Sequence, residues 1–242
     1  MLPIGGKPLV VRVVERVLAS QTVLRAIVAT DDPRIIEAVN SRGFEAMITR
    51  SDHASGSDRV AEVARQLAAE IIVNVQGDEP LIDPETIDRA VRALVLDPEV
   101  QMATSSEPIA NAADVLNPAV VKVAVDAEGY ATSFSRNPIP FPNHAVQRHG
   151  SIEAALENEP ALPSSFRKHT GLYVYRRRFL LEFASWPQSE SEASESLEQL
   201  RALDRGVRIR VIEAASTSIA VYTMKDLERV RAIVEREERI AV

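Results

Sequence analysis

The regular alternation of short apolar runs with amphipathic segments constrains the fold of this chain more than any other feature. Runs rich in Val, Ile and Ala lie at 24–30, 44–50 and 71–76, and such runs predict strands of a buried sheet. In the amphipathic segments around them, helices are predicted over 8–19, 31–43, 57–70 and 84–96. The alternation of strand and helix predicts an α/β fold with a doubly wound, mostly parallel sheet.

Residue types at the helix boundaries support these ranges. Pro8 and Pro84 suit the first position of a helix, where no backbone N–H is needed. Asp32 and Ser57 are predicted to cap their helices through side-chain oxygens, and Gly43 is a C-terminal stop.

The pattern changes after residue 100. Strands are predicted over 101–109, 119–126, 129–136, 169–177 and 207–214, the second and third forming a hairpin around Glu128 and Gly129. Residues 140–166, rich in Pro, Glu, Asn and Ser, predict a surface loop or weak helix. Helices are predicted near 177–185, 194–204 and 224–238.

Composition narrows the class of protein. The formal net charge of −7 over 242 residues argues against a nucleic-acid-binding surface, although a few converging Arg and Lys could hold a small anion. The lack of cysteine excludes disulfides and thiolate metal sites and fits a reducing compartment. Charges interrupt any signal-peptide core in the first 20 residues, and no apolar stretch approaches the ~20 residues that span a bilayer. We therefore expect a cytoplasmic protein without a membrane partner.

The stretch IIVNVQGDEPLIDP (71–84) is the strongest candidate for a site. Ligands in open α/β sheets bind beyond the carboxyl ends of the strands, and Gln76, Asp78 and Glu79 follow a predicted buried strand. A carboxylate there can hold Mg²⁺, which takes one or two carboxylates together with waters and phosphate oxygens. By position alone, an ordinary acidic turn before a capped helix explains the same residues equally well.

Through this stretch and others along its length, the chain resembles the 3-deoxy-manno-octulosonate (Kdo) cytidylyltransferases, also called CMP-Kdo synthetases. The resemblance runs from residue 4 to about 235 and rests on segments that occur in family order: GGKPL, VATDD, TRSDHASGSDR, VNVQGDEP, NPAVVKVAVDAEGYATSFSR, RKHTGLYVYR, ESLEQLR and DLERV. Each segment is weak by itself, but their order makes the resemblance specific.

The resemblance implies a Rossmann-like, nucleotide-diphospho-sugar-transferase-like single domain over 1–242. A nucleotide-binding core would span 1–110 and 205–242, and a smaller mixed α+β lobe for sugar-acid binding and dimerisation would span about 111–204. The implied reaction transfers CMP from CTP to Kdo and releases pyrophosphate, for lipopolysaccharide biosynthesis. Mg²⁺ is the implied cofactor and a homodimer the implied assembly.

Site residues follow from the same resemblance. Asp78 is implied as a Mg²⁺ ligand and catalytic residue, and Arg136 as a catalytic residue that also binds the sugar acid. The implied nucleotide-binding residues are Arg50, Ser51, Asp52, Arg59 and Gln76. The implied sugar-acid-binding residues are Arg136, His169, Tyr173, Glu198 and Gln199. An arginine can grip a carboxylate through two hydrogen bonds, and the other side chains can bond hydroxyls.

Some of these residues have simpler interpretations. Ser57 to Arg59 can be a plain N-cap followed by a solvated arginine, and a histidine on a strand is more often structural than functional. Lys122 is typical of the family but could be an outward strand residue. The run Arg176–Arg178 is interpreted as a solvated turn without a role.

Two departures from the family pattern stand out. The Gly-Lys-Pro at 6–8 matches the turn that enters the first helix, so the family's first strand and its triphosphate-binding loop have no counterpart in 1–242, and Lys7 is not expected to bind triphosphate. The strands at 24–30 and 71–76 would then lack their shared neighbour, with a cost in stability unless they pair with each other. Tyr222 stands where the family has a second Mg²⁺-binding Asp, and a neutral phenol cannot replace a carboxylate on Mg²⁺.

Three functions therefore stay open at this point. The first is CMP transfer from CTP to Kdo, and the second is the same reaction with another sugar acid, such as an amino-Kdo or a sialic acid. The third is a non-catalytic relative that acts as a binding or dimer-partner protein, which the two departures favour.

Overall fold

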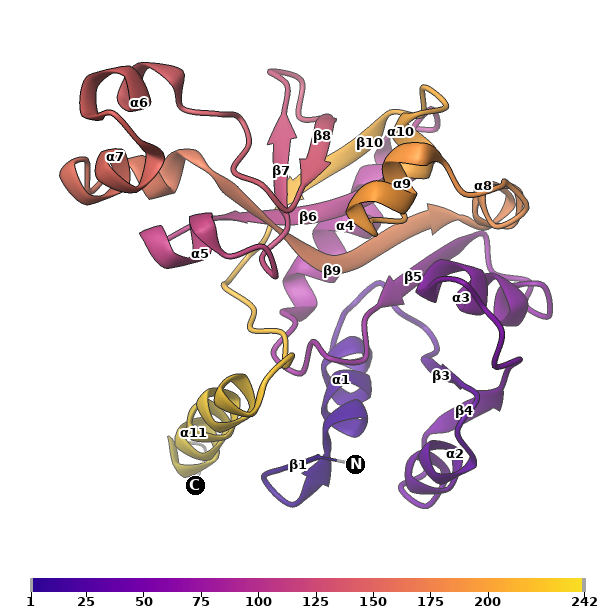
Figure 1. Cartoon of the computed structure of the whole chain (residues 1–242). Helices are drawn as coiled ribbons and strands as arrows, with labels where there is room; N and C mark the ends of the chain where they lie inside the picture. The colour runs from indigo at the N-terminus through magenta and orange to yellow at the C-terminus, as the bar shows by residue number, and fades with distance from the viewer. Residues whose placement is uncertain (1, 241–242) are drawn as a thin grey trace.

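The computed structural model describes residues 2–240 and has an α/β architecture (Figure 1). The elements of the first half are β1 (Pro3–Ile4), β2 (Lys7–Pro8), α1 (Leu9–Leu18), β3 (Ile27–Thr30), α2 (Pro33–Asn40), β4 (Glu45–Ile48), α3 (Gly56–Ala64), β5 (Ile71–Val75), α4 (Pro84–Leu96) and β6 (Met102–Pro108). Those of the second half are α5 (Ala112–Leu116), β7 (Lys122–Val125), β8 (Ala131–Ser135), α6 (Asn143–His149), α7 (Ile152–Asn158), the short 3₁₀ helix η1 (Leu162–Ser165), β9 (Arg167–Arg176), α8 (Arg177–Phe183), α9 (Glu190–Glu195), α10 (Leu200–Leu203), β10 (Ile209–Glu213) and α11 (Met224–Ile240).

The main sheet is organised around β9. Its strand order is β10-β6-β9-β7-β8, and β5 pairs with the second half of β9. β9 is antiparallel to β6, β5 and β7, whereas β10 and β6 are parallel. The β6–β9 register shifts between Thr104 and Ser105, which marks a bulge in the ladder.

The predicted α/β class is confirmed, but the sheet is mixed rather than mostly parallel. Strands and helices do alternate from β3 to α4, as the apolar pattern predicts. The antiparallel pairs enter with β7, β8 and β9, which come from the second half of the chain. Periodicity identifies β9 as a strand, but it carries no information on strand direction.

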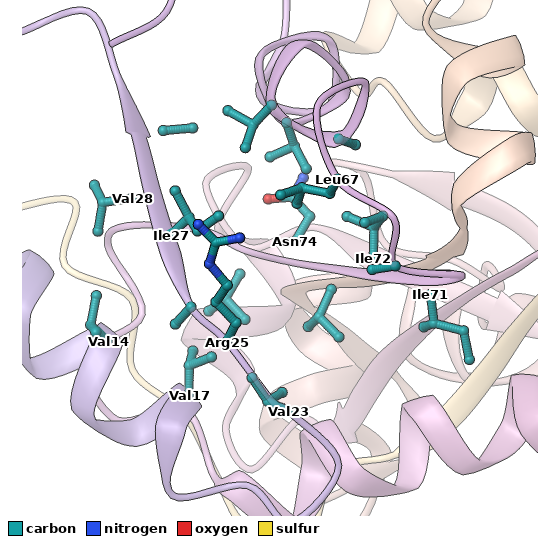
Figure 2. A pocket seen from close by; sticks show the side chains of 18 of the residues that line it. Val14, Val17, Val23, Arg25, Ile27, Val28, Leu67, Ile71, Ile72 and Asn74 are labelled. Carbon is teal, nitrogen blue, oxygen red and sulfur yellow. The ribbon is translucent and has the colours of Figure 1, made fainter. Parts of the chain in front are cut away.

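β3 and β4 form a separate small sheet. They pair in parallel from Ile27 opposite Glu45 to Thr30 opposite Ile48. In the part of the chain that the structure describes, β3 pairs with no other strand and β5 pairs only with β9. A cavity of about 900 Å³ lies between β3 and β5 (Figure 2). Among the described residues, therefore, no strand pairs with both β3 and β5, and the two strands do not pair with each other.

Helices cover both faces of the main sheet through alternate residues of β9. Leu172 and Val174 belong to the apolar cluster that includes α4. Tyr173 and Tyr175 point to the other face and pack with residues of α3 and α8. The Tyr175 ring stacks 6.1 Å from that of Phe183. No helix within residues 2–240 has the length and apolar character needed to cross a bilayer.

Two of the three consecutive arginines at the junction of β9 and α8 are structural, so the interpretation of Arg176–Arg178 as a solvated turn was wrong. Arg176 Nη2 donates to the Leu94 carbonyl at 2.7 Å, at the C-terminal end of α4. Arg177 Nε donates to the Ala64 carbonyl at 2.7 Å, at the end of α3. Each guanidinium binds carbonyl groups that a helix end leaves without intrahelical partners. Only Arg178 is exposed.

The N-terminal segment forms a tight hairpin before α1. Gly5 and Gly6 occupy the turn between β1 and β2 with φ of 52° and 71°. Positive φ at both central residues is the requirement of a type I′ hairpin turn, which glycine meets at little cost. The hairpin packs Ile4 against α11, and Lys7 Nζ pairs with Glu15 of α1 at 2.6 Å.

The predicted N-cap of the third helix was wrong. The N-cap of α3 is Ser55, whose hydroxyl accepts from Asp58 N at 3.2 Å, and Ser57 instead lies fully buried inside the first turn.

Of the two alternatives predicted for residues 140–166, a surface loop or weak helix, the structure has the second, as α6, α7 and η1. Their helices are short, and Leu156 and Phe166 are buried with Ile109 and Val115, so tertiary packing stabilises a segment whose own helix signal is weak.

A buried ion pair fixes the segment between α9 and α10. Arg201 Nη2 and Nε donate to Glu192 at 2.6 and 2.8 Å, and the two side chains are only 4% and 5% exposed. The guanidinium also lies 4.7 Å from the centre of the Phe183 ring. Both charges are thus compensated without solvent.

Replacing Arg201 by Met should lower the free energy of unfolding by about 3–5 kcal/mol, because Glu192 would remain buried without a partner. Urea denaturation measures this difference. Arg25→Ala is the matched control, since the Arg25–Glu45 pair is about half exposed on each side, and it should change stability little. The double variant Arg201→Met/Glu192→Leu should recover much of the loss. Equal effects of Arg201→Met and Arg25→Ala would contradict the assignment.

Candidate active site

The loop after β5 carries the first group of candidate residues. β5 ends at Val75, and α4 begins at Pro84 with Asp83 as its side-chain N-cap. The loop between them is held at its start, because Gln76 N donates to the Gly171 carbonyl of β9 at 3.0 Å. The loop therefore leaves the sheet at a fixed point beside β9.

Glu79 anchors this loop to two distant segments. Its Oε1 accepts from Gly171 N at 3.2 Å, and its Oε2 accepts from the Ser218 hydroxyl at 2.5 Å. A Cβ on Gly171 would lie 2.9 Å from Gln76 Cγ and 3.2 Å from Glu79 Oε1. Glycine at this position therefore permits the close approach of both side chains. The Gly in KHTGLY was the only sequence signal for this contact.

Asp78 is left with a free oxygen in this arrangement. Its Oδ1 is buried and has no hydrogen-bond partner among the described residues. Burial, together with the neighbouring charge of Glu79, raises the pKa of the Asp78 carboxyl to about 6. An unpaired buried carboxylate oxygen is costly, and this one is available to a cation.

The segment before α11 brings Tyr222 to the same place. Val221 N donates to the Asp78 carbonyl at 2.8 Å. Partial burial and the charges of Asp78 and Glu79 raise the pKa of the Tyr222 phenol to about 12, while Arg136 acts in the opposite direction. The bond from Val221 N thus holds the adjacent Tyr222, which is 64% exposed, close to the Asp78 backbone.

The donor set fits Mg²⁺ held by one protein carboxylate. Within residues 2–240 there is no cluster of three or more His, Cys, Asp or Glu that could form a complete metal site. Mg²⁺ does not need one, because it keeps waters and takes phosphate oxygens from its substrate. Asp78 is the residue that would hold it, through the oxygen that has no other partner.

Arg136 lies at the end of β8 and is held by main-chain oxygens. Its Nε donates to the Glu195 carbonyl at 2.9 Å and its Nη1 to the Pro118 carbonyl at 3.0 Å. Lys122 Nζ donates to the Arg136 carbonyl at 2.9 Å and to the Asn117 carbonyl at 2.8 Å. Lys122 is fully buried, so the interpretation of it as an outward strand residue was wrong. Its role is to fix the backbone that carries Arg136.

His169 sits on β9 with a defined tautomer. The Thr104 hydroxyl donates to the Leu172 carbonyl at 2.7 Å, so its oxygen accepts from His169 Nε2–H at 2.8 Å. Nδ1 is then left as an acceptor. Burial lowers the pKa of the imidazole to about 3, so the ring is neutral near pH 7.

Tyr173 and Gln199 form a second buried polar pair. The Tyr173 hydroxyl donates to Gln199 Oε1 at 3.0 Å, and Gln199 is 1% exposed. Gln199 Nε2 has no hydrogen-bond partner within the described residues. The rings of His169 and Tyr173 lie 5.3 Å apart, so these three side chains form one cluster with two unused polar atoms, His169 Nδ1 and Gln199 Nε2.

Glu198 lies at the N-terminus of α3 and not free in a pocket. Its Oε1 accepts from the Ser57 hydroxyl at 2.7 Å and its Oε2 from Ser57 N at 3.2 Å. The Ser57 hydroxyl also lies 2.9 Å from the Tyr175 hydroxyl. Glu198 thus accepts from a backbone N–H at the start of α3, which is a structural role. The contact with a sugar acid that the resemblance implies would be made by a carboxylate already bonded in this way.

The residues implied for the nucleotide divide into two groups. Arg50 and Asp52 form an exposed bidentate pair with both distances 2.8 Å, and Ser51 is exposed between them. Arg59 instead donates to the Thr49 hydroxyl at 2.6 Å and pairs with Asp31 at 3.2 Å. The solvated-arginine interpretation of Arg59 was therefore wrong, because its guanidinium ties α3 to the ends of β3 and β4.

The structure brings most predicted residues toward one edge of the sheet. Gln76 lies beside Gly56 at the start of α3, Val221 N bonds the Asp78 carbonyl, and Tyr173 contacts His169 and Gln199. The side chains of Arg50 and Asp52 pair with each other after β4, where the Arg50 carbonyl also accepts from Arg59 Nη1 at 3.2 Å. Sequence reasoning missed Lys168, whose Nζ donates to Glu107 at 2.6 Å and to the Ser218 carbonyl at 2.7 Å, and so holds the segment that leads to Tyr222. No local motif signals that contact.

Comparison with known proteins gives one consistent family. A family model described as cytidylyltransferase matches residues 1–209. The 3-deoxy-manno-octulosonate cytidylyltransferase of Geobacter sulfurreducens is 49% identical over 227 residues, which are 94% of this chain and 89% of the relative. That of Pseudomonas syringae pv. syringae is 46% identical, with 96% of this chain and 90% of the relative covered.

Solved structures agree with this result. A CMP:2-keto-3-deoxy-manno-octonic acid synthetase complexed with CTP superposes with a TM-score of 0.84 at 40% identity, covering 98% of this chain and 91% of the other. A putative glucose-1-phosphate thymidylyltransferase from Bacillus anthracis, at 15% identity and a TM-score of 0.62, shares the fold alone. The chain therefore belongs to the 3-deoxy-manno-octulosonate cytidylyltransferase family.

Proposed function

We propose that this protein transfers CMP from CTP to Kdo and releases pyrophosphate. The observation that carries the proposal is the buried Asp78 oxygen without a partner, placed beyond the carboxyl end of β5. This is the edge at which open α/β sheets bind ligands. The family relationship supplies the substrates, since relatives at 46–49% identity bear the name of this reaction.

The residues of the chain are proposed to act mainly by positioning the nucleotide and the sugar acid for reaction. Mg²⁺, when bound at Asp78, would neutralise phosphate charge during attack of a sugar hydroxyl on the α-phosphate of CTP. Gln76 lies beside Gly56 at the start of α3, and Arg59 of α3 lines the same cavity as Gln76; both are proposed to contact the nucleotide. Arg50, Ser51 and Asp52 are proposed to close over it from the loop after β4.

The sugar acid is proposed to bind on the β9 side of Asp78. Neutral His169 offers Nδ1 as an acceptor, and Gln199 offers an unpaired N–H donor for sugar hydroxyls. Tyr173 orients Gln199 through its hydroxyl. Arg136 is proposed to bind the carboxylate of the sugar acid, while Glu198 holds Ser57 and the start of α3 at the edge of this pocket.

We further propose that the protein acts as a homodimer in the cytoplasm and supplies lipopolysaccharide biosynthesis. These proposals rest on the family alone. Another sugar acid is the nearest alternative substrate, and a panel of sugar acids with CTP would distinguish it. Tyr222 beside Asp78 favours a second candidate, a non-catalytic relative that binds a partner without turnover.

The function is tested by pyrophosphate release from CTP, Kdo and MgCl₂ with the 242-residue chain. Asp78→Asn should lower kcat/KM by at least about a hundredfold, because it removes the proposed metal carboxylate. Glu157→Gln, at an exposed position of α7, should leave the rate unchanged. Background release by the unaltered chain, with no CTP-dependent rise in Tm, would favour the non-catalytic candidate.

Tyr222→Asp should lower the Mg²⁺ concentration needed for half-maximal activity, because a second carboxylate would join Asp78 at the cation. The measurement is a titration of activity with MgCl₂ at fixed CTP. Tyr222→Phe removes the hydroxyl without adding charge and should leave the Mg²⁺ dependence close to that of the unaltered chain. Identical titrations for Tyr222→Asp and Tyr222→Phe would show that position 222 does not face the metal.

His169 should make stability depend on pH. Its pKa is lowered to about 3 in the folded state, whereas an unfolded histidine titrates near 6.5. Below about pH 6 only the unfolded chain binds this proton, so the free energy of unfolding falls by roughly 1.4 kcal/mol per pH unit. Urea denaturation between pH 4.5 and 6 should show this slope, and His169→Gln should lose it. The control is His144→Gln at an exposed position; an equal change of slope there would refute the assignment.

A further inference from the structure

The segment of residues 214–223 joins β10 to α11 without a helix or strand of its own (Figure 1). Its first residue is bonded to the main sheet, since Ala214 N donates to the Ser106 carbonyl of β6 at 2.9 Å. Near its other end Val221 N donates to the Asp78 carbonyl at 2.8 Å. The segment therefore reaches the candidate site as a connection that is bonded to the protein at both ends.

Ser218 lies between these two points and uses all of its polar groups on charged side chains. Its hydroxyl donates to Glu79 Oε2 at 2.5 Å, and its N–H donates to Glu107 Oε2 at 3.2 Å. Its carbonyl accepts from Lys168 Nζ at 2.7 Å. Ser218 is 3% exposed, and both carboxylate residues are buried as well. Because water does not reach these groups, it cannot replace a hydrogen bond that is lost there.

Each oxygen of the two carboxylates has a donor in this arrangement. Glu79 Oε1 accepts from Gly171 N at 3.2 Å, and Glu107 Oε1 accepts from Lys168 Nζ at 2.6 Å. Ser218 supplies the donors to the other two oxygens. Two buried carboxylates thus depend on one serine for half of these bonds, and loss of its hydroxyl would leave Glu79 Oε2 buried without a partner.

Glu79 is the residue through which Ser218 reaches Asp78. The segment 214–223 contacts two consecutive residues of the loop after β5, because Ser218 bonds the Glu79 side chain and Val221 bonds the Asp78 carbonyl. These two contacts hold the peptide between Asp78 and Glu79 from one side. The direction of the Asp78 side chain therefore depends on a segment that lies about 140 residues away in the sequence.

We propose that Ser218 is a positioning residue for Asp78: through Glu79 it holds the loop so that the free Asp78 oxygen keeps one orientation. Ser218 acts in this way without contact to substrate or metal. The inference rests on the proposed function only for the use of Asp78 as a metal ligand, because the contacts of Ser218 require neither nucleotide nor Mg²⁺.

Hydrogen exchange of the full chain, without CTP or Mg²⁺, tests whether Ser218 holds the loop. In Ser218→Ala the amide hydrogens of Glu79, Ile82 and Val221, which are bonded within the loop or to it, should exchange at least about tenfold faster. Ser216→Ala is the matched control, because it makes the same substitution at an exposed serine whose hydroxyl donates to the N-cap of α4 at 2.7 Å. It should leave these three amides unchanged, and equal acceleration in both variants would overturn the proposal.

The Mg²⁺ dependence of turnover separates positioning from a purely structural role. Ser218→Ala should raise the MgCl₂ concentration for half-maximal pyrophosphate release by about tenfold or more, because a group that orients a metal ligand is lost. At saturating MgCl₂, kcat should stay within about twofold of the unaltered chain. A fall in kcat without a shift of the MgCl₂ midpoint would overturn the proposal. Ser218→Cys, whose thiol is a weaker donor of similar size, should change both measurements in the same direction by less, and it serves if Ser218→Ala does not fold.

The inference and the proposed function can fail separately. If the unaltered chain releases no pyrophosphate while Ser218→Ala still accelerates exchange in the loop, the proposed function fails and the positioning of the Asp78 loop stands. If the unaltered chain is active and exchange in Ser218→Ala equals that in Ser216→Ala, only the role of Ser218 is refuted.

Discussion

β9 is hydrogen-bonded along both of its edges, and the candidate site depends on this pairing. β6 follows β9 from Arg167 to Tyr175, while β7 and β5 share its opposite edge. Alternate side chains of β9 therefore reach both helical layers, and His169, Gly171 and Tyr173 fall toward the site. The bulge between Thr104 and Ser105 lies opposite this segment, where it places the Thr104 hydroxyl between His169 and the Leu172 carbonyl.

The charged residues around the site are mostly held by the protein itself. Glu79 binds Gly171 and Ser218, Lys122 binds two carbonyl groups, and Arg201 binds Glu192. Such groups are costly to bury unless paired, and once paired they move little. The exception is Asp78, with one oxygen left over. Rigid side chains around one carboxylate oxygen that lacks a hydrogen-bond partner are expected of a site that positions a cation and its phosphate ligands before reaction.

Local patterns in the sequence predicted local structure well. The helix over 84–96 matches α4 residue for residue, because Asp83, Pro84 and the apolar spacing all specify the same start and phase. The roles of Arg176 and Ser57 were not predictable in this way. Arg176 binds α4 and Ser57 binds Glu198, 141 residues away, and no local pattern encodes such partners. The direction of β9 depends likewise on the whole topology.

The same limit applies to the site. Family motifs named Asp78, Arg136, His169, Tyr173 and Gln199, and the structure packs the last three of these into one cluster. The motifs could not show that Glu198 bonds the first turn of α3 or that Lys122 fixes the backbone of Arg136. Both roles depend on contacts between residues that no single motif contains. Burial and unpaired atoms add what residue identity lacks: they separate side chains already satisfied by the protein from those still available to a ligand.

β5 links the cavity beside β3 to the candidate site. Its side chains line the cavity, and its carboxyl end leads into the loop of Gln76 and Asp78. Unpaired backbone groups cost free energy mainly when water cannot reach them, and the partial exposure of Ile27 to Ala29 indicates that water reaches the edge of β3. The Asp78 loop does not depend on that edge. It is held by β9, since Gln76 N donates to the Gly171 carbonyl and Gly171 N donates to Glu79, so the site keeps its geometry through the most fully paired strand of the sheet.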